Sequence, residues 1–467
     1  MKQLEEALRN WLAQAGIEYS DAEFSDFKKR MIRNAWGKIV KERMDERIII
    51  KNAVDTATIV MPNARVGEAY RTDVPFCVEG VEDYVIEGLE PTGLNYYKTE
   101  GQGFTIQGTP QPEDIKGGDF PLVLRYRPYN LLEGEPWLER KLNFIVNPDP
   151  RSLWQNIPTP EDIEYYKPDS DMEYVKVEAT PEGLPRKDIV AASQRGRSHA
   201  HEGKPRDDHF KLHFCEQTEW YIMAVADGAG SARYSREGSR IACETAVEHC
   251  TAALASNNDF GKAIYNYHFD KDSAEARKAV GNMIYSIVGN AALKAHNAIK
   301  QEAERKEGAR LKDYATTLLL AICRRFDFGW VIASFWVGDG AMCVYNAEEH
   351  TADMLGMPDE GEYAGQTRFL TMPEIFTDQQ AFVKRLRFKV YQDFTALLMM
   401  TDGVSDPKFE TDANLQNIDK WDTLWQDLKD GGVELTDDNE QSQQQLLAWL
   451  DFWDRGNHDD RTLAILY

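Results

Sequence analysis

The chain has 467 residues, of which 54 are basic and 78 acidic, so its formal net charge is −24. Such an acidic excess argues against a nucleic-acid partner and against binding to an anionic membrane, whereas it is compatible with divalent metal ions. The length exceeds one ordinary hydrophobic core, and two or three folded units are expected. The polar, acidic start and the lack of a membrane-length apolar run predict a soluble, cytoplasmic protein.

The first 150 residues change pattern once. Residues 1–48 carry apolar residues at helical spacing, and Ser20 with Glu23 forms a capping-box pattern, so two helices are expected there. Residues 49–150 break into strand-sized apolar runs between Gly, Pro, Asn and Asp, which predicts a small all-β sandwich. The run from Gly88 to Pro110 resembles the immunoglobulin-like modules of many bacterial proteins, which bind partners or act as spacers.

Residues 151–187 are rich in Pro, Asp and Glu and lack long apolar periodicity. We interpret them as a solvated linker, ordered in part by its Tyr and Trp residues. From residue 188 to 467 the chain instead alternates pairs of apolar strands with pairs of helices. This alternation predicts an α+β domain with helices on the outer faces of the sheets.

Acidic residues stand at the ends of the apolar strands in this last segment. An isolated Asp-Gly pair after a strand most often marks a turn. Here, however, the pattern recurs within one domain, at Asp207-Asp208, Asp227, Asp339, Asp402 and Asp459-Asp460. If these strand ends converge, the carboxylates repel one another unless a cation neutralises them.

The residue types indicate which cation this would be. The six cysteines form no CxxC pair and lie mostly in apolar segments, which predicts reduced core residues and neither disulfides nor a zinc site. Carboxylate oxygens are ligands for hard divalent ions. The sequence therefore favours Mg²⁺ or Mn²⁺.

The strand ends belong to short motifs that follow one another along the chain: GRSHAHEGKPRDDHF, VADGAGS, DYATTLLL, VGDGAMCVY, TDGVSD and HDDRTLAI. Their order and spacing resemble the metal-dependent serine/threonine protein phosphatases of type 2C, and most closely the bacterial branch of that family. The resemblance covers residues 188–467. It implies a multidomain chain whose α+β phosphatase domain has four layers (α-β-β-α), with the metal ions at one edge of the paired sheets.

The resemblance also implies a ligand set for two catalytic Mn²⁺ or Mg²⁺ ions. Asp227 corresponds to the carboxylate that bridges both ions, and the carbonyl of Gly228 to a further ligand of one. Asp402 and Asp459 correspond to the aspartates that complete the second ion's shell. Asp207 stands where the family has its first acidic ligand.

Four further residues gain roles in the same way. Asp339 and Asp406 correspond to the pair that, with Asp402, holds a third and more weakly bound ion. Asp208 corresponds to an aspartate behind the metal ligands. His199 is the candidate proton donor to the leaving alkoxide, or else a histidine that braces its loop.

One departure concerns the phosphate. Many family members have an arginine four residues before the first acidic ligand, whereas this chain has Gly203 there. Arg197 or Arg206 could supply the charge, since a guanidinium pairs with phosphate through two hydrogen bonds, or either could be a surface arginine paired with local carboxylates. The stretch Gly361 to Thr371 resembles the variable flap beside the site in the bacterial branch; it could also be an ordinary loop.

The implied activity is hydrolysis of phosphoserine or phosphothreonine by water that the metal ions activate. The implied partners are phosphoprotein substrates and a cognate serine/threonine kinase or its targets. Two other functions stay open, namely hydrolysis of small phosphate esters and a non-catalytic adaptor built on the phosphatase fold. The intact acidic set argues against the adaptor.

Overall fold

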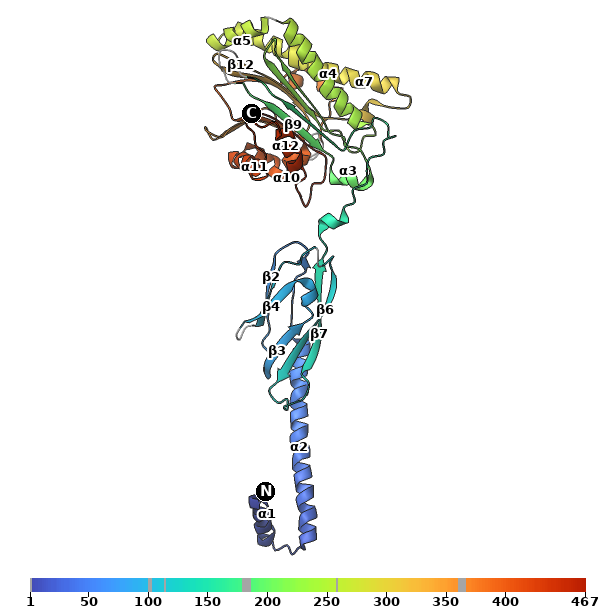
Figure 1. Cartoon of the computed structure of the whole chain (residues 1–467), viewed down its shortest axis with the longest axis vertical. Helices are drawn as coiled ribbons and strands as arrows, with labels where there is room; N and C mark the ends of the chain where they lie inside the picture. Colours follow the sequence, from blue (N-terminus) through green and yellow to red (C-terminus); the bar gives the residue numbers. More distant parts are fainter. Residues whose placement is uncertain (1, 100–102, 113–114, 179–185, 258, 360–366) are drawn as a thin grey trace. The chain divides into compact units, whose positions relative to one another are not determined.

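The computed structural model describes the chain except for residues 1, 100–102, 113–114, 179–185, 258 and 360–366 (Figure 1). The chain divides into two compact units, Met1–Leu153 and Trp154–Tyr467. Among the described helices, none combines the length and the apolar character that crossing a membrane requires.

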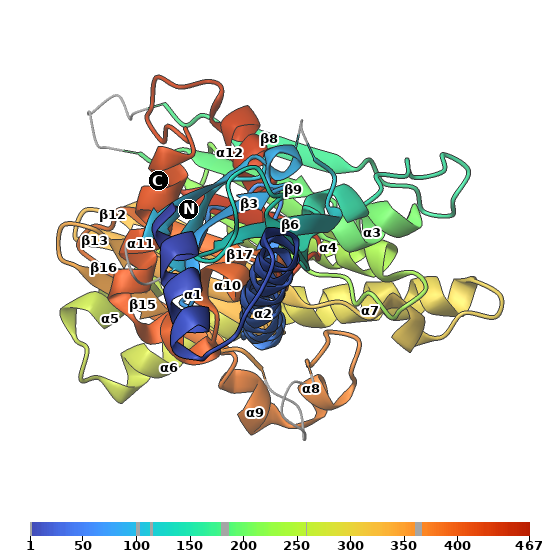
Figure 2. The ribbon, with the colours of Figure 1, turned by 90° about the horizontal axis from the view of Figure 1, so that it is seen from below.

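Unit 1 begins with two helices, α1 (Lys2–Gln14) and α2 (Asp21–Thr56). The predicted capping box is confirmed, since the Ser20 hydroxyl accepts a hydrogen bond from the Glu23 N–H and the Glu23 carboxylate accepts one from the Ser20 N–H at 2.8 Å. α1 lies against the start of α2, where the Arg9 guanidinium sits 4.1 Å from the ring centre of Phe24 (Figures 1 and 2). The predicted end of the helical segment at residue 48 is wrong, because Ile50 and Val54 extend α2 into the core of the unit.

The rest of unit 1 is built from seven strands among the described residues: β1 (Ala64–Arg65), β2 (Tyr70–Pro75), β3 (Val81–Glu87), β4 (Leu94–Thr99), β5 (Gly103–Gly108), β6 (Gly118–Pro128) and β7 (Leu138–Asn147). They form one sheet in the order β1-β7-β6-β3 and another in the order β2-β5-β4. Phe104 of the second sheet and Leu122 and Phe144 of the first belong to one hydrophobic cluster together with Val54. The two sheets and α2 therefore share one core.

Unit 2 contains two antiparallel sheets. One has the order β10-β11-β12-β13-β16, with the bounds β10 (His209–Cys215), β11 (Trp220–Ala226), β12 (Leu318–Phe326), β13 (Gly329–Val337) and β16 (Leu386–Tyr391). The other has the order β15-β14-β17-β18-β9-β8, with the bounds β8 (Ser170–Val175), β9 (Ile189–Gln194), β14 (Ala341–Asn346), β15 (Thr351–Met354), β17 (Ala396–Met400) and β18 (Arg461–Leu466).

The helices of unit 2 are α3 (Arg197–Glu202), α4 (Ser235–Ser256), α5 (Asp259–Phe269), α6 (Ala274–Ile284), α7 (Asn290–Arg305), α8 (Glu374–Thr377), α9 (Gln379–Val383), α10 (Asp402–Phe409), α11 (Ile418–Asp430) and α12 (Ser442–Leu450). Five residues in a π-helical turn, Tyr285–Gly289, join α6 to α7. Short 3-10 turns, including Leu311–Tyr314 and Asp412–Gln416, connect further elements.

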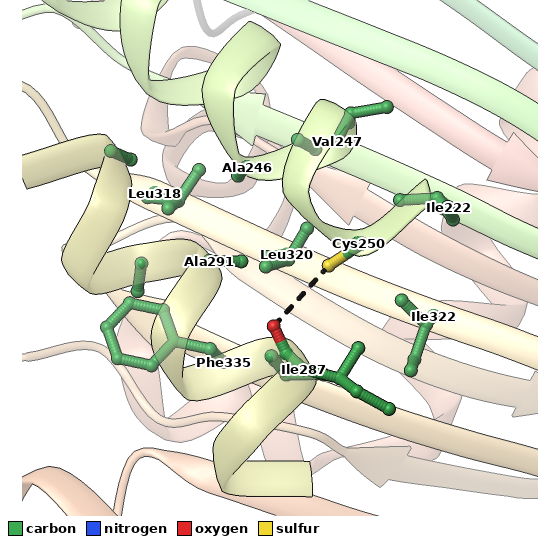
Figure 3. Packing of buried hydrophobic residues seen from close by; sticks show 14 of the residues in the cluster. Ile222, Ala246, Val247, Cys250, Ile287, Ala291, Leu318, Leu320, Ile322 and Phe335 are labelled. Carbon is green, nitrogen blue, oxygen red and sulfur yellow. Dashed lines mark hydrogen bonds between the residues drawn. The ribbon is translucent and has the colours of Figure 1, made fainter. Parts of the chain in front are cut away.

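Alternation along β11 shows how the two sheets pack. Its odd-numbered residues, such as Met223, belong to a cluster that also contains Leu397 and Ala464 of the other sheet. Its even-numbered residues, such as Ile222, face α4 and α7 instead. Figure 3 shows this second face, where the Cys250 thiol of α4 lies 3.8 Å from the Ile287 carbonyl oxygen above Leu320 and Ile322. A strand with both faces buried reads as one continuous apolar run, which is the pattern of WYIMAVA.

The outer face of the second sheet carries a third hydrophobic cluster. Val190, Leu398 and Ile465 of this sheet pack there with Trp421 of α11 and Leu450 of α12. The clusters therefore occur on both outer faces and between the sheets, and each outer face is covered by helices.

The cysteines have the reduced state that the sequence predicts. All six are free thiols, and five of them are buried in unit 2. Cys77 differs from the prediction because it is exposed on unit 1.

The predicted linker over residues 151–187 is wrong for most of its described part. β8 pairs along its whole length with β9, from Ser170 opposite Gln194 to Val175 opposite Ile189. Lys167 is buried, and its ammonium donates hydrogen bonds of 3.0 Å to the Asp208 carbonyl and of 3.0 Å to the Ser239 hydroxyl. The sequence concealed this because β8 is an edge strand of mixed polarity (SDMEYV) whose residues are only half-buried.

These contacts lead to a test of the boundary. A chain that starts at Trp154 is expected to fold cooperatively, whereas one that starts at Glu173 loses half of β8 and Lys167. Loss of Lys167 leaves a buried carbonyl without its donor, at a cost of about 1–3 kcal/mol, and the broken strand adds to this. The shorter chain should therefore melt about 5 °C lower or more in a calorimetric scan. Equal melting temperatures would show that residues 154–172 are a dispensable linker after all.

Candidate metal centre

The two sheets of unit 2 bring three predicted acidic residues together. Asp227 follows β11, Asp339 lies in the turn between β13 and β14, and Asp402 begins α10 directly after β17. One carboxylate oxygen of each residue lies within 4.8 Å of one oxygen of each of the other two. A second group that meets the same criterion consists of His199, Asp459 and Asp460.

The carboxylates of the first group destabilise one another's charged form. The pKa of Asp227 lies well above its ordinary value, first because of burial and then because of the neighbouring charges of Asp402 and Asp208. The pKa of Asp402 is raised well above its ordinary value in the same way, by burial and then by Asp339. One carboxylate oxygen each of Asp339 and Asp402 is buried without a hydrogen-bond partner in the described part of the chain. Such oxygens fit hard divalent cations.

Backbone contacts fix the position of Asp227. Its N–H donates to the Thr317 hydroxyl at 2.8 Å, and its carbonyl accepts from the Thr317 N–H and the Thr316 hydroxyl at the same distance. A Cβ on Gly228 would lie 2.6 Å from the Asp207 carbonyl oxygen, so only glycine allows this loop to approach Asp207. The Asp-Gly pair therefore forms a turn and also brings the segment of Asp227 into close contact with the segment of Asp207.

His199 is held by an aspartate that the sequence analysis did not assign. Its Nδ1 lies 3.0 Å from Asp460 Oδ2, while its Nε2 lies 3.8 Å from Asp207 Oδ2. Burial alone lowers the pKa of His199, but the charges of Asp460, Asp207 and Asp459 outweigh burial and raise this pKa to about 9. In the metal-free chain, these neighbouring carboxylates therefore favour the protonated imidazole. Asp460 was identifiable only as the second Asp of the HDDRTLAI motif.

Asp460 also joins two loops. Its Oδ1 accepts the Gly196 N–H at 2.6 Å, and its Oδ2 accepts the Asp207 N–H at 2.5 Å. Burial and the charge of Asp460 raise the pKa of Asp207 to about 6. Asp207 Oδ1, like one oxygen each of Asp339 and Asp402, is buried without a hydrogen-bond partner among the described residues.

Two predicted residues lie at the margins of these groups. Asp208 is buried, and its Oδ2 accepts hydrogen bonds from the hydroxyls of Thr401 at 2.9 Å and Thr462 at 2.7 Å, so it ties its loop to the second sheet. Asp406 follows Asp402 by one helical turn on α10. Burial and then the charge of Asp339 raise the pKa of Asp406 to about 6.

The two arginines predicted to bind phosphate contact other carboxylates. Arg197 Nη2 lies 2.6 Å from Asp451 Oδ1, and the buried Arg206 has its Nη2 3.6 Å from Asp171 Oδ2. A different arginine, Arg236, approaches the acidic residues, with Nη1 4.0 Å from Asp207 Oδ1. The only sequence signal for Arg236 is its place eight residues after Gly228, inside the VADGAGSARYSR run.

The predicted flap is only partly described. Gly361–Gln366 lie outside the described residues. The part that is described reaches the site, since the Thr367 hydroxyl donates a hydrogen bond to Asp339 Oδ2 and the Leu370 N–H donates one of 2.7 Å to the Thr316 carbonyl.

Comparison with known proteins identifies the class of the chain. The model of the protein phosphatase 2C family matches residues 195–451, which is more than half of the chain. The chain belongs to this family. Members of the family are metal-dependent, and the buried carboxylate oxygens without partners fit that requirement.

Several solved structures are similar to part of the chain. A bacterial serine phosphatase is 16% identical, with a TM-score of 0.34 and coverage of 60% of this chain and 96% of that one. PppA from Pseudomonas aeruginosa is 13% identical, with a TM-score of 0.34 and coverage of 61% and 98%. The serine/threonine phosphatase Stp1 from Staphylococcus aureus is 15% identical, with a TM-score of 0.32 and coverage of 67% and 96%. No curated protein sequence matches.

The raised pKa values lead to a test that needs no substrate. Asp207 and Asp406 have pKa values of about 6, above the ~4 of an unfolded aspartate. Without metal, the folded chain therefore binds more protons than the unfolded chain between about pH 4 and 6, and the contribution of these groups to stability falls as the pH rises through that window. Bound cations displace these protons. The rise in melting temperature on adding Mn²⁺ should thus be larger, by about 3 °C or more, near pH 7.5 than near pH 5.

The matched variant is Asp402→Asn. It removes one of the repelling charges, so its metal-free melting temperature at about pH 7.5 should be higher than that of the wild type, while Mn²⁺ should raise it less. If Mn²⁺ raised the melting temperature equally at both pH values, and equally in the wild type and in Asp402→Asn, this would contradict a metal centre at these carboxylates.

Proposed function

We propose that the chain hydrolyses phosphoserine and phosphothreonine in proteins, with water activated by two Mn²⁺ or Mg²⁺ ions. The observation that carries this proposal is the convergence of Asp227, Asp339 and Asp402 from the ends of both sheets of unit 2. A buried oxygen of Asp339 and one of Asp402 lack hydrogen-bond partners in the described part of the chain, and the family to which the chain belongs is metal-dependent. A non-catalytic adaptor would have no reason to retain this arrangement.

The proposed ligands of the two catalytic ions are Asp207, Asp227, Gly228 through its carbonyl, Asp402 and Asp459. Asp339 and Asp406 would hold a third ion together with Asp402. Bound in pairs, such ions lower the pKa of water to near neutrality and orient a phosphoryl group for in-line attack. No cysteine or serine nucleophile is needed.

His199 is the proposed proton donor to the departing alkoxide. Its Nδ1 is engaged by Asp460, which fixes the ring, while its Nε2 has Asp207 as its nearest carboxylate at 3.8 Å. Burial lowers the pKa of His199, but the charge of Asp460, which is not among the proposed ligands, raises it and so favours a ring with a proton on both nitrogens. Both earlier interpretations of His199 are therefore compatible, because one nitrogen braces the loop and the other can give up a proton.

Unit 1 has a separate proposed role. Its two sheets with a common core support an immunoglobulin-like module that binds a partner of the catalytic unit, such as a phosphoprotein substrate or its kinase. A tethered module of this kind raises the effective concentration of whatever it binds.

The first activity test concerns the cofactor. Hydrolysis of a phosphoserine peptide is expected to need added Mn²⁺ or Mg²⁺, to stop in excess EDTA, and to survive alkylation of the exposed Cys77 thiol. Phosphate release measured under these three conditions checks the prediction. Full activity in EDTA would refute it, and so would loss of activity on alkylation while the metal stays bound. Turnover of aryl phosphate without any phosphopeptide turnover would favour a hydrolase of small phosphate esters.

The second activity test concerns the ligands. Asp227→Asn and Asp402→Asn should each lower kcat by roughly a thousandfold or more, because each removes a charge that holds a catalytic ion. Asp339→Asn should have a smaller effect, since the third ion binds weakly. Asp438→Asn, at an exposed position away from the centre, is the control and should behave as the wild type. Wild-type kcat in the Asp227 and Asp402 variants would remove the basis of the proposal.

A further inference from the structure

A cavity of about 470 Å³ opens beside Asp207. Three segments of unit 2 form it: residues 163–164 ahead of β8, residues 204–205 ahead of β10, and residues 230–234 after β11 together with Arg236 in the first turn of α4. Asp207 itself forms part of the wall. The cavity therefore adjoins the proposed metal centre and shares Asp207 with it.

The cavity is lined by cations, in a chain whose net charge is −24. Arg236 is 7% exposed, and three backbone carbonyl contacts fix its guanidinium: Nε and Nη2 donate to the Glu164 carbonyl at 3.0 and 2.6 Å, and Nη1 donates to the Arg233 carbonyl at 3.2 Å. Arg233 is exposed at the rim, with its guanidinium 4.9 Å from the ring centre of Tyr234. Within the described part of the chain, Arg233 forms no ion pair at contact distance, although its charge adds to that of Lys306 in lowering the pKa of the Glu164 carboxylate.

The acidic residues around the cavity are already engaged. The Glu164 carboxylate pairs with Lys306, and the Glu202 carboxylate pairs with Lys204 at 2.5 Å. Asp207, the carboxylate that Arg236 approaches at 4.0 Å, is a proposed metal ligand. Arg233 and Arg236 therefore leave an excess of positive charge, and guanidinium groups of this kind bind carboxylate and phosphate oxygens.

The position of the cavity indicates which part of a substrate would enter it. A Cβ on Gly230, in the cavity wall, would lie 3.8 Å from His199 Nε2, the proposed proton donor. If the phosphoryl group of a peptide substrate lies at the metal centre, the residue next to the phosphorylated one would thus lie at the mouth of the cavity. Ile163, Pro205 and Tyr234 supply apolar walls, which suit the aliphatic stem of a side chain whose charged end meets the arginines.

We propose that this cavity binds an anionic side chain of the protein substrate, a carboxylate or a second phosphoryl group, adjacent to the phosphorylated residue. The proposal rests on the proposed protein phosphatase function and adds a substrate class to it. Arg233 is the residue that sets the preference, because it lies at the rim without a carboxylate partner among the described residues. Arg236 forms the fixed floor.

The test uses the full chain with Mn²⁺ and three phosphoserine peptides of one sequence. They differ only in the residues beside the phosphoserine, which are alanine, aspartate or a nonhydrolysable phosphonate analogue of phosphoserine. The wild type should have a higher kcat/KM for the anionic peptides than for the alanine peptide. Arg233→Ala should lower this ratio about tenfold, mainly through KM, since it removes one charge-assisted contact. Arg233→Glu should invert the preference, and Arg233→Lys should retain most of it.

Arg277→Ala is the matched control. This arginine is exposed on α6, donates to the Asp272 carbonyl at 2.9 Å and lies outside the cavity wall, so the ratio should stay at the wild-type value. Whichever peptide, the one with aspartate or the one with the phosphonate, has the larger increase in kcat/KM over the alanine peptide identifies the anion that the cavity accepts.

Two results would overturn the inference alone: a wild-type enzyme that turns over all three peptides equally well, or an Arg233→Ala variant that loses activity on all of them alike. If the wild type hydrolyses aryl phosphate but none of the peptides, the protein phosphatase function itself is wrong and the inference falls with it.

Discussion

The structure of unit 2 depends on how the mutual repulsion of its buried carboxylates is neutralised. Asp227, Asp339 and Asp402 have oxygens within 4.8 Å of one another, and their pKa values are raised by burial and by their neighbours. At this spacing, ionised carboxylates in a low-dielectric site repel by several kcal/mol, unless protons or cations intervene. Protonation of the carboxylates would relieve the repulsion in the folded chain, but protonated carboxyls would bind no catalytic ion at neutral pH. Divalent cations satisfy both the charge and the unpartnered oxygens.

The remainder of the unit holds these charges in place against that repulsion. The apolar faces of both sheets pack on each other and on helices, which fixes the strand ends from which the aspartates come. Local contacts then set the loops: Gly228 lets the Asp227 loop approach Asp207, Asp460 joins the Asp207 loop to His199, and Lys167 holds the Asp208 carbonyl. The carboxylate centre and the adjacent cavity with Arg233 and Arg236 are thereby built from segments that are far apart in the sequence.

The sequence predicted the features that depend on local patterns and failed where tertiary contacts decide. The wholly apolar run of β11, the Ser20 capping box and the phosphatase motifs were all recognisable, because each is written in consecutive residues. The linker prediction failed because β8 is a half-buried edge strand, and the burial of Lys167 follows from packing that no local pattern records. Arg236 was missed for the same reason, since its approach to Asp207 depends on the path of the intervening loop.

We infer that cations, not protons, neutralise the aspartates at the strand ends. A crystal structure of the full chain grown with Mn²⁺ near neutral pH, with an anomalous difference map at the manganese edge, tests this most directly. We expect peaks between the carboxylates of Asp227 and Asp402 and beside Asp207. Full-occupancy protein density with no anomalous peak at these carboxylates, or manganese bound only elsewhere, would contradict it.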